Sequence, residues 1–505
     1  MNLQDLFAVP RHRSPDKAAL RFEGRTLSYG ELFAAADRVA AGLRARGLAP
    51  GDRIAFFLGN RPEFVIALLA ALRLGAVVVP MNLAYRRREI LHILGDAEPR
   101  LLLSELSQEP VLEELAPGER PELILAEDLE ALAGDPGPWP LVDGSDLAML
   151  LYTSGTTGKS KGAEITHDNV LATVTGLLAA WDWGPWDRLL LTLPLFHTHG
   201  LVVGLHCALA AGATVHLRRR FEARDVAAGL LAREATLFFG VPTMYGRLIE
   251  ELHKWRDPGG RLDLSGVRLF CSGSAPLSAE TFAAFRELTG HEILERYGMT
   301  ETGMNTSNPY ERERIAGTVG LPLPGVEIRV ADPETGTPVG TDEIGMIEIR
   351  GPNVFKGYWR MPEKTAAEFR EDGFFISGDL GKIDAQGYVH IVGRGKDLII
   401  TGGYNVYPKE VESEIDAIDG VVESAVIGLA HPDFGEGVTA VVVKSGEAAL
   451  TEKDVLGRLE TRLAKFKLPK QVIFVDDLPR NTMGKVQKNI LRDTYGTLYA
   501  QVARP

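Results

Sequence analysis

Residues 152–162 read YTSGTTGKSKG and combine residue types that can bind phosphate. Each position from Thr153 to Thr157 is glycine or carries a hydroxyl, and two lysines follow. Glycine lets the backbone approach a ligand closely, while hydroxyls and backbone amides can surround phosphate oxygens. The apolar run LAMLLY precedes the stretch, and Thr166 with Asn169 can begin a helix after it. We therefore expect a strand, a glycine-rich turn and a helix that form a phosphate site.

This stretch does not complete the pattern of P-loop NTPases, which is G-x-x-x-x-G-K-[ST]. Gly158, Lys159 and Ser160 match the end of that pattern, but Thr153 stands where the first glycine is required. The sequence also has no clear apolar–Asp segment to act as the Walker B partner. A P-loop switch or motor is therefore disfavoured. A flexible surface turn is the structural alternative for such a stretch taken alone.

Four further segments carry polar side chains at expected turns: SGSAPL (272–277), ERYGMTE (295–301), FISGDLG (375–381) and LPRNTMGKVQK (478–488). Taken alone, each has an ordinary structural explanation. Asp379, for example, would be a turn former in a tight loop, and Lys485 would be an exposed lysine. The occurrence of all these segments in one order along one chain is the stronger evidence for a shared site.

The composition limits the class of protein. With 505 residues, 45% hydrophobic and 24% charged, the chain is expected to form a soluble protein of two or more domains. Its formal net charge of −13 disfavours nucleic-acid binding through backbone phosphates, although ATP can still bind a local basic cluster. Two cysteines cannot form a disulfide framework. We expect a cytoplasmic protein with no membrane insertion, because prolines and histidines interrupt the uncharged stretch between Arg188 and Arg218, and the start has no signal-peptide core.

Helical and strand patterns alternate along the first 320 residues, for example a helix at 30–47 and another at 62–75. This alternation predicts an α/β fold of parallel sheets with helices on both faces. After residue 320 short strands dominate, which indicates a β-rich subdomain. We expect a large N-terminal domain over 1–394 and a small, mobile C-terminal α+β domain over 395–505, with the boundary near 393–397.

The motifs YTSGTTGKSKG, YGMTE, GDLG, GRGKDLIITGGYNVYP and PRNTMGK resemble those of the adenylate-forming superfamily of acyl-CoA synthetases, luciferases and peptide-synthetase adenylation domains. They span nearly the whole chain. Within the superfamily, LPLFHTHG and ERYGMTETGMNTSNPY look most like malonyl-CoA synthetases. The sequence departs from the wider pattern at Ser160, where proline is commoner, but both residues favour a non-helical loop.

This resemblance implies an acid–thiol ligase that requires ATP, Mg²⁺ and CoA and acts on malonate or methylmalonate. The acid's carboxylate would attack the α-phosphorus of ATP to give an acyl-AMP and pyrophosphate. The CoA thiolate would then displace AMP. The first step brings two anions together, so cations must offset the charge of the transition state.

The resemblance also implies site residues. For ATP they are Thr153, Ser154, Gly155, Thr156, Thr157, Gly158, Lys159, Ser160, Lys161, Gly273, Ser274, Ala275, Tyr297, Gly298, Met299, Thr300, Asp379, Arg394 and Lys485. Within this set the stretch 153–161 would hold the β and γ phosphates, Tyr297 would stack on adenine, and Asp379 would accept the ribose hydroxyls. The residues expected to act in catalysis are Lys485, Thr300, Glu301 and His197, and Glu301 would bind Mg²⁺.

Arg296 is the candidate partner of the acid's distal carboxylate, because a guanidinium can bind a carboxylate through two hydrogen bonds. His199 and Ser272 are weaker candidates for the same task, and by resemblance His197 lies at the pocket wall. The structural alternative for Arg296 is a salt bridge to Glu295. Zinc binding by the two histidines is disfavoured, because further ligands at metal spacing do not follow.

In the C-terminal part, Lys396 aligns with the family's hinge. After rotation, the loop Gly402–Gly403–Tyr404 would shape the pantetheine tunnel and replace Lys485 at the site. Lys485 also resembles a regulated acetylation site, so a lysine acetyltransferase is an expected partner.

Three other functions stay open at this point. The protein could be a short- or medium-chain fatty acyl-CoA synthetase, a stand-alone adenylation domain that loads a carrier protein, or a non-catalytic family descendant. The last is disfavoured because every catalytic signature is intact.

Overall fold

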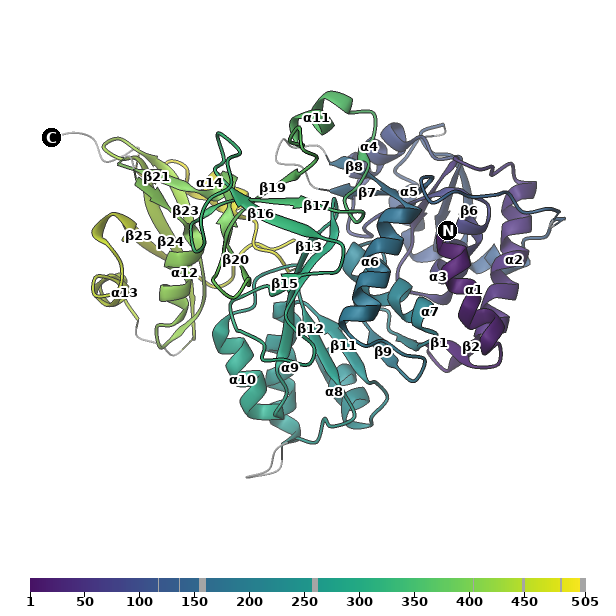
Figure 1. Ribbon diagram of the computed structural model, residues 1–505, viewed down its shortest axis with the longest axis horizontal. Helices are drawn as coiled ribbons and strands as arrows, with labels where there is room; N and C mark the ends of the chain where they lie inside the picture. The colour runs from purple at the N-terminus through teal and green to yellow at the C-terminus, as the bar shows by residue number, and fades with distance from the viewer. Residues whose placement is uncertain are drawn as a thin grey trace.

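The computed structural model describes residues 1–116, 118–135, 137–153, 160–256, 262–402, 404–446, 450–481 and 484–499. Within these residues the strands form four sheets. Figure 1 shows the layered N-terminal part at the right and bottom of the view, and the C-terminal strands and helices at the left in yellow-green. This mixed α/β architecture, with parallel sheets and a smaller C-terminal part, confirms the predicted fold class.

One sheet of nine strands runs in the order β15–β14–β13–β12–β11–β9–β10–β1–β2. Its strands are β1 (Ala18–Phe22), β2 (Arg25–Ser28), β9 (Arg188–Leu191), β10 (Thr214–Leu217), β11 (Leu237–Gly240), β12 (Leu269–Ser272), β13 (Ile293–Met299), β14 (Gly303–Ser307) and β15 (Leu321–Pro322). Neighbours from β13 to β1 are parallel, and the pairs at both ends are antiparallel. Because parallel strands end at one edge, the residues after β12 and those late in β13 come together there.

A second sheet of seven strands runs in the order β18–β8–β7–β4–β3–β5–β6. Its strands are β3 (Arg53–Phe57), β4 (Val77–Pro80), β5 (Leu101–Ser104), β6 (Glu122–Leu125), β7 (Leu147–Thr153), β8 (Lys161–Thr166) and β18 (Gly357–Tyr358). Strands β3 and β4 send alternate side chains into two different apolar clusters. Ile54 packs with α2 and α3 on one face, and Ala55 packs with α4 on the other, so helices cover both faces of this sheet.

The helices of the described residues are α1 (Leu3–Arg13), α2 (Tyr29–Ala45), α3 (Pro62–Arg73), α4 (Arg87–Ala97), α5 (Glu109–Leu112), α6 (His167–Ala180), α7 (Cys207–Ala211), α8 (Ala223–Leu231), α9 (Pro242–Trp255), α10 (Ala279–Thr289), α11 (Pro362–Ala367), α12 (Pro408–Asp416), α13 (Glu452–Leu459) and α14 (Lys488–Tyr495). Several begin at capping boxes that are visible in the sequence. Ser28 with Glu31 caps α2, and Thr166 with Asn169 caps α6 as expected.

The glycine-rich stretch lies in a different setting from the one the sequence predicted. It connects β7 to an antiparallel partner, β8, and the helix begins only at His167, after β8. The expected order of strand, turn and helix is therefore wrong, because a second strand precedes the helix. The reason is the segment KGAEIT, whose four buried residues pack on both sides of a strand at 161–166.

A third sheet of four antiparallel strands consists of β16 (Glu327–Ala331), β17 (Gly345–Arg350), β19 (Phe375–Ile383) and β20 (Val389–Arg394). Asp379 lies inside β19, so the expected tight loop at this position is wrong. The strand continues through the two glycines of GDLG because it contains an irregularity between Leu380 and Gly381 where its register with β20 shifts.

The fourth sheet lies in the C-terminal part and consists of β21 (Ile399–Thr401), β22 (Tyr404–Val406), β23 (Val421–His431), β24 (Gly435–Lys444) and β25 (Gln471–Val475). It has its own apolar cluster, in which Val411 and Ile415 of α12 pack against Val438 and Val455. An independent core is what a separate domain requires. The division at residues 394 and 395 stays a prediction.

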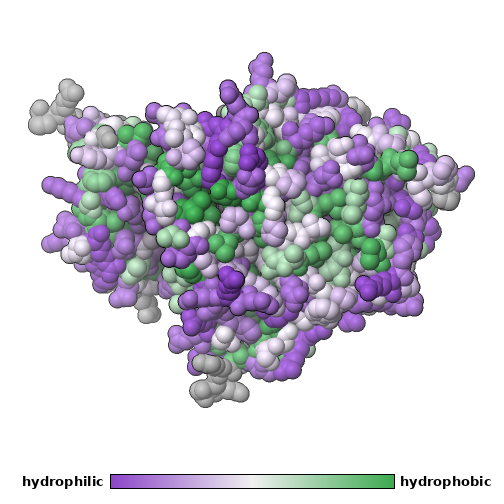
Figure 2. All heavy atoms as spheres, in the orientation of Figure 1, coloured by the Kyte–Doolittle hydropathy of each residue, from purple (hydrophilic) through white to green (hydrophobic). Residues whose placement is uncertain are grey.

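The uncharged stretch 189–217 contains β9, a π-helical segment (His199–His206), α7 and β10. The π-helical segment lies in the part of the stretch that contains His199 and His206, two of the histidines noted in the sequence. In the described part of the chain, no helix combines the length and the apolarity needed to span a membrane. Figure 2 shows one face of the molecule, with hydrophilic residues along most of the outline and apolar residues in patches nearer the centre.

Candidate active site

Strand β13 carries the centre of the candidate site. Residues 296–299 lie in the strand, and Thr300 and Glu301 follow in the turn to β14. Successive side chains of a strand point to opposite faces, so Glu295 and Arg296 diverge. The carboxylate of Glu295 accepts a hydrogen bond of 2.9 Å from the backbone N–H of Leu277. This bond ties the SGSAPL segment to β13.

The polar groups expected around the ribose bind one another. The hydroxyl of Tyr297 donates to Oδ2 of Asp379 over 2.5 Å, and Nε of Arg394 pairs with Oδ1 of Asp379 over 2.6 Å. Asp379 and Arg394 face each other directly in the β19–β20 pair. The carboxylate of Asp379 is buried but neutralised, and both of its oxygens are oriented.

Lys485 lies on a loop that docks against the N-terminal part. Gly484, with φ of 73°, precedes it, and a Cβ there would lie 2.8 Å from Oγ1 of Thr243 on α9, so only glycine fits. The backbone of Lys485 exchanges two hydrogen bonds with Asn481. Although the residue has exposed surface, burial of its ammonium group and the charge of Arg394 lower the pKa of Lys485 to about 8.

Glu301 is a buried carboxylate with hydroxyl partners. Its Oε1 lies 3.1 Å from the hydroxyl of Tyr358 and 3.5 Å from Oγ1 of Thr153. The same tyrosine hydroxyl lies 2.7 Å from Oε2 of Glu368. Lys161 lies 3.6 Å from Glu368 and 4.0 Å from the ring centroid of Tyr358. Burial raises the pKa of Glu301, and among the described residues it forms no ion pair.

The predicted acyl pocket, in contrast, contains buried polar atoms without hydrogen-bond partners among the described residues. The side chain of Arg296 is buried, and its guanidinium lies against Gly273, where a Cβ would be 2.4 Å from Cζ. Within the described residues, Nε and Nη2 of Arg296 have no hydrogen-bond partner. Ser272 Oγ and His199 Nε2 are also buried there without a partner. Four unpaired polar atoms therefore belong to three residues of the predicted acyl pocket.

His197 and His199 form different hydrogen bonds in the structure. The backbone N–H of His199 donates to Nδ1 of His197 over 3.2 Å, so the neutral ring of His197 carries its proton on Nε2. Nδ1 of His199 lies 3.2 Å from Oγ of Ser274. Burial lowers the pKa of His197 to about 4 and that of His199 well below its usual value. Both rings are neutral near neutral pH, so they can share hydrogen bonds but add no positive charge.

Comparison with known proteins places the chain in a family. Residues 7–359 match the AMP-binding enzyme family, and residues 410–485 match the AMP-binding enzyme C-terminal domain. The chain belongs to the AMP-binding enzyme family. The predicted membership of the adenylate-forming superfamily is thereby confirmed.

Relatives within this family carry several names. A feruloyl-CoA synthase from an Amycolatopsis species is 38% identical over 504 residues, which cover 98% of this chain and 100% of the relative. A malonate–CoA ligase from Arabidopsis thaliana is 34% identical over 528 residues, which cover 95% of this chain and 86% of the relative. The crystal structure of ATP-bound MatB from Rhodopseudomonas palustris matches with a TM-score of 0.92 and 50% identity, over 99% of this chain and 100% of that one.

Sequence reasoning missed two residues of this AMP-binding enzyme. Tyr358 and Glu368 contact Glu301 and Lys161, yet neither stands in a motif that indicated chemistry. Lys364 and Glu368 are four residues apart and do form an ion pair of 2.6 Å. That spacing, however, predicts only a surface pair on a helix, so the sequence held no signal for the link to Glu301.

Other predicted residues lie apart from this cluster or outside the described residues. Ser154–Lys159 and Gly403 are not among the described residues. Lys396 lies in a short 3₁₀ turn (Gly395–Asp397) between β20 and β21. Tyr404 is 59% exposed and stacks on Phe466 at 4.7 Å, so it contacts the C-terminal part itself. Gly402 adopts φ of 58°, which suits glycine.

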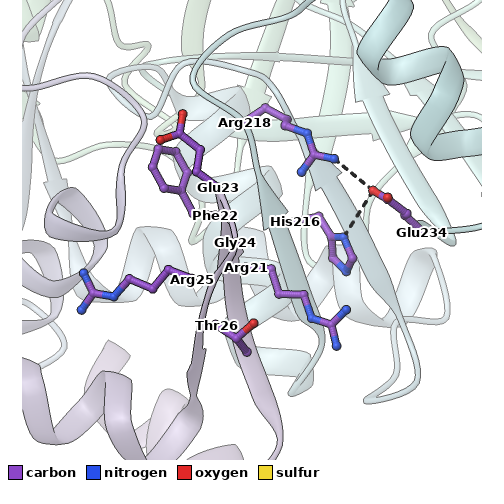
Figure 3. Close-up of a pocket in the computed structure, with 9 residues that line it drawn as sticks. All are labelled: Arg21, Phe22, Glu23, Gly24, Arg25, Thr26, His216, Arg218 and Glu234. Atoms are coloured by element: carbon purple, nitrogen blue, oxygen red, sulfur yellow. Dashed lines mark hydrogen bonds and ion pairs between the residues drawn. The ribbon is translucent and has the colours of Figure 1, made fainter.

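A surface pocket of about 320 Å³ opens elsewhere, beside the β1–β2 hairpin (Figure 3). In this pocket, Glu234 pairs with Arg218 over 3.0 Å and lies 3.9 Å from His216. None of its lining residues belongs to the predicted site. The chemistry of the candidate site is therefore argued from the buried polar groups around β13 and not from this hollow.

Proposed function

We propose that this protein is an AMP-forming acid–thiol ligase that converts malonate or methylmalonate to its CoA thioester. The family supports an AMP-forming acyl-CoA ligase. The choice of acid is the further step, because relatives named for ferulate and for malonate are both similar to the chain.

The buried guanidinium of Arg296 carries the proposal. Cys271 is the printed side-chain partner of the guanidinium, and its Nε and Nη2 have no partner within the described residues. Leaving N–H groups of a buried charged side chain unpaired costs free energy, which a ligand that supplies acceptors would recover. A carboxylate matches Nε and Nη2 of Arg296 with two parallel hydrogen bonds. A malonate molecule offers one carboxylate for activation and a second for Arg296, whereas butyrate offers only a methyl group at the same end.

The salt bridge to Glu295 does not explain Arg296. No ion pair joins these two residues among those that the structure describes, and Glu295 is bonded to the backbone of Leu277. Burial raises the pKa of Glu295 to about 7. Burial therefore disfavours the charged form of Glu295 that a salt bridge would require. The distal carboxylate of a substrate is the better partner.

In the proposed reaction, Arg296 with His199 and Ser272 would hold the distal carboxylate, beside the pocket wall formed by His197. The free carboxylate would then attack the α-phosphorus of ATP, and pyrophosphate would leave. The ammonium of Lys485 and the hydroxyl of Thr300 would offset negative charge at the α-phosphate. Asp379 would exchange its present partners in part for the ribose hydroxyls, with Arg394 beside it.

The residues around Glu301 fit a bound Mg²⁺ ion. Glu301 is buried, its partners are hydroxyl groups, and it forms no ion pair within the described residues. When bound, Mg²⁺ would offset charge on the phosphates of ATP, a task for a hard cation with oxygen ligands. Glu301 would hold it, and Tyr358 would fix the orientation of the carboxylate.

For the thioester step we propose that the C-terminal part rotates about Lys396, so that Gly402–Tyr404 replaces Lys485 and CoA attacks the acyl-AMP. The docked Lys485 loop described above corresponds to the adenylation step in this proposal. Acetylation of Lys485 would remove its charge and stop adenylation.

An ATP–pyrophosphate exchange assay with malonate, methylmalonate, butyrate and ferulate at equal concentrations tests the proposal. We expect exchange with the two diacids and little with butyrate. Preference for ferulate or butyrate would contradict the diacid assignment while leaving an AMP-forming ligase. Offering CoA and a phosphopantetheinylated carrier protein in separate reactions then identifies the thiol, and we expect transfer to CoA.

A further inference from the structure

Helix α4 lies against the antiparallel pair of β7 and β8, at the end where Thr153 and Lys161 face each other. Ile90 and Ile93 face the apolar core. His92 and Asp96 are four residues apart, so their side chains leave the helix on the same side. The family motifs discussed above do not include either residue.

These two side chains contact both strands of the hairpin. Nε2 of His92 lies 2.7 Å from the carbonyl oxygen of Ser160. Because a carbonyl oxygen only accepts, Nε2 carries the hydrogen of this bond. Oδ2 of Asp96 accepts a hydrogen bond of 2.5 Å from the hydroxyl of Tyr152. The rings of His92 and Tyr152 also meet edge to face, with centroids 6.3 Å apart.

The contacts lie at the point where the glycine-rich stretch leaves the sheet. Tyr152 directly precedes Thr153, and Ser160 directly precedes Lys161. Thr153 and Lys161 face each other in the last pair of the β7–β8 ladder. One side of α4 therefore holds the outgoing strand through Asp96 and the returning strand through His92.

Asp96 makes a second connection, through its backbone. Its carbonyl oxygen accepts a hydrogen bond of 3.1 Å from Nε1 of Trp359. The backbone N–H of Trp359 in turn donates to the carbonyl oxygen of Gly162 over 2.8 Å. Trp359 directly follows Tyr358, the partner of Glu301. The end of α4 thus joins the hairpin to the segment that orients the proposed Mg²⁺ ligand.

We propose that His92 and Asp96 are positioning residues for the triphosphate of ATP. They fix the separation of the two hairpin strands, so that Thr153 and Lys161 meet the β and γ phosphates without a further ordering cost. This inference rests on the proposed function, because the phosphate role of residues 153–161 belongs to that proposal.

A merely structural role predicts a different pattern of loss. If the bonds only stabilise the fold, their removal weakens the binding of every nucleotide alike or of none. If they position Thr153 and Lys161 for the β and γ phosphates, their removal weakens the binding of ATP and spares that of AMP, which lacks those phosphates. The difference between the two nucleotides is the measurement that decides.

Titration calorimetry of the full chain with Mg-ATP and with AMP, without acid, tests the proposal. The variants are His92→Ala, His92→Gln and Tyr152→Phe, and the control is His253→Ala, an exposed histidine on α9. We expect the Kd for ATP to rise about tenfold in His92→Ala and in Tyr152→Phe, the change for losing one hydrogen bond of ordinary strength. The Kd for AMP should stay within about twofold.

The glutamine variant should recover most of the ATP affinity, since its amide can donate to the same carbonyl oxygen. Equal weakening of ATP and AMP, or an unchanged Kd for ATP, would overturn the proposal. If His92→Ala does not fold, Tyr152→Phe decides, because it removes a single oxygen atom and keeps the ring.

Failure of the proposed function gives a different result. Wild-type protein that binds ATP but activates neither malonate nor methylmalonate would refute the acid assignment, while a selective loss of ATP affinity would still support the role of His92 and Asp96. Wild-type protein that binds no ATP would refute both.

Discussion

The proposed ribose side and the proposed acyl side of the candidate site differ in whether their buried polar groups have partners. On the ribose side, Asp379 is paired with both Tyr297 and Arg394. On the acyl side, Arg296, His199 and Ser272 keep buried polar atoms without partners among the described residues. Asp379 and Arg296 are both buried, so the burial of the central charged group does not explain the difference.

This difference separates what folding requires from what binding requires. Paired polar groups can be buried at little net cost, whereas each unpaired one costs about 1 to 3 kcal/mol, and more when it is charged. Under the proposed function, the paired groups would bind the nucleotide. The unpaired N–H groups of Arg296 need hydrogen-bond acceptors, which the distal carboxylate of a diacid would supply. The selection of the acid should therefore depend on them.

The largest expected effect comes from Lys485, which lies beside the paired groups. Lys485→Ala should reduce adenylation about a thousandfold, because it removes a cation placed at the developing charge. Thioester formation from supplied acyl-AMP should be largely intact. Separate single-turnover assays of the two steps measure this, with the exposed Lys465→Ala as the control. Equal loss in both steps would show that Lys485 does not belong to adenylation alone.

Arg296→Ala tests the unpaired side. It should lower kcat/KM for malonate by about a hundredfold, which corresponds to about 3 kcal/mol for breaking a buried ion pair. Butyrate should lose far less, because it places no charge at the guanidinium. Arg286→Ala, on the exposed surface of α10, is the matched control. A common factor for malonate and butyrate would make Arg296 structural and remove the main support for the diacid.

The sequence predicted the fold class correctly, since alternating patterns indicated the layered α/β architecture. The family resemblance predicted Asp379, Arg394 and Arg296 in one site, and their roles there stay predictions. The segment KGAEIT was missed as a strand because a helix cap directly after it dominated the interpretation. Asp379 was expected in a loop because GDLG is typical of turns, while the bulged strand depends on pairing with β20.

Tertiary contacts explain what the sequence left out. Tyr358 and Glu368 come near Glu301 only because β18 pairs with β8, far away in the chain. Nε and Nη2 of Arg296 have no partner among the described residues because Glu295 points to the other face of β13, and the guanidinium fits there because residue 273 is glycine. Such features depend on contacts between segments that are distant in the sequence, and neither residue type nor spacing specifies those contacts.

A smaller effect is expected at the turn between the two parts. Lys396→Pro should slow thioester formation more than adenylation, because proline restricts the dihedral change needed for the second orientation. Lys396→Ala removes the same charge without that restriction and should affect neither step strongly. Measuring both half-reactions in both variants separates backbone from charge. Identical slowing of the two steps in the proline variant would contradict a hinge here.

The smallest expected effect is a pH dependence that links Lys485 to the paired side. Burial and the charge of Arg394 lower the pKa of Lys485 to about 8, so its ammonium form is lost as pH rises through that value. Adenylation should therefore fall about twofold between about pH 7 and about pH 8, and by up to about tenfold for each further unit. Single-turnover rates across this range measure it.

Two variants sharpen this pH test. Lys485→Arg should show a flat profile, whatever its absolute rate, because a guanidinium stays protonated throughout. Asp379→Asn should move the loss of activity to lower pH, since Asp379 raises the pKa of Lys485 and also neutralises Arg394. A wild-type profile that stays flat to about pH 10, near the usual lysine pKa, would show that the ammonium is not enclosed beside Arg394. The paired groups would then act on the ribose alone and leave the charge of Lys485 unaffected.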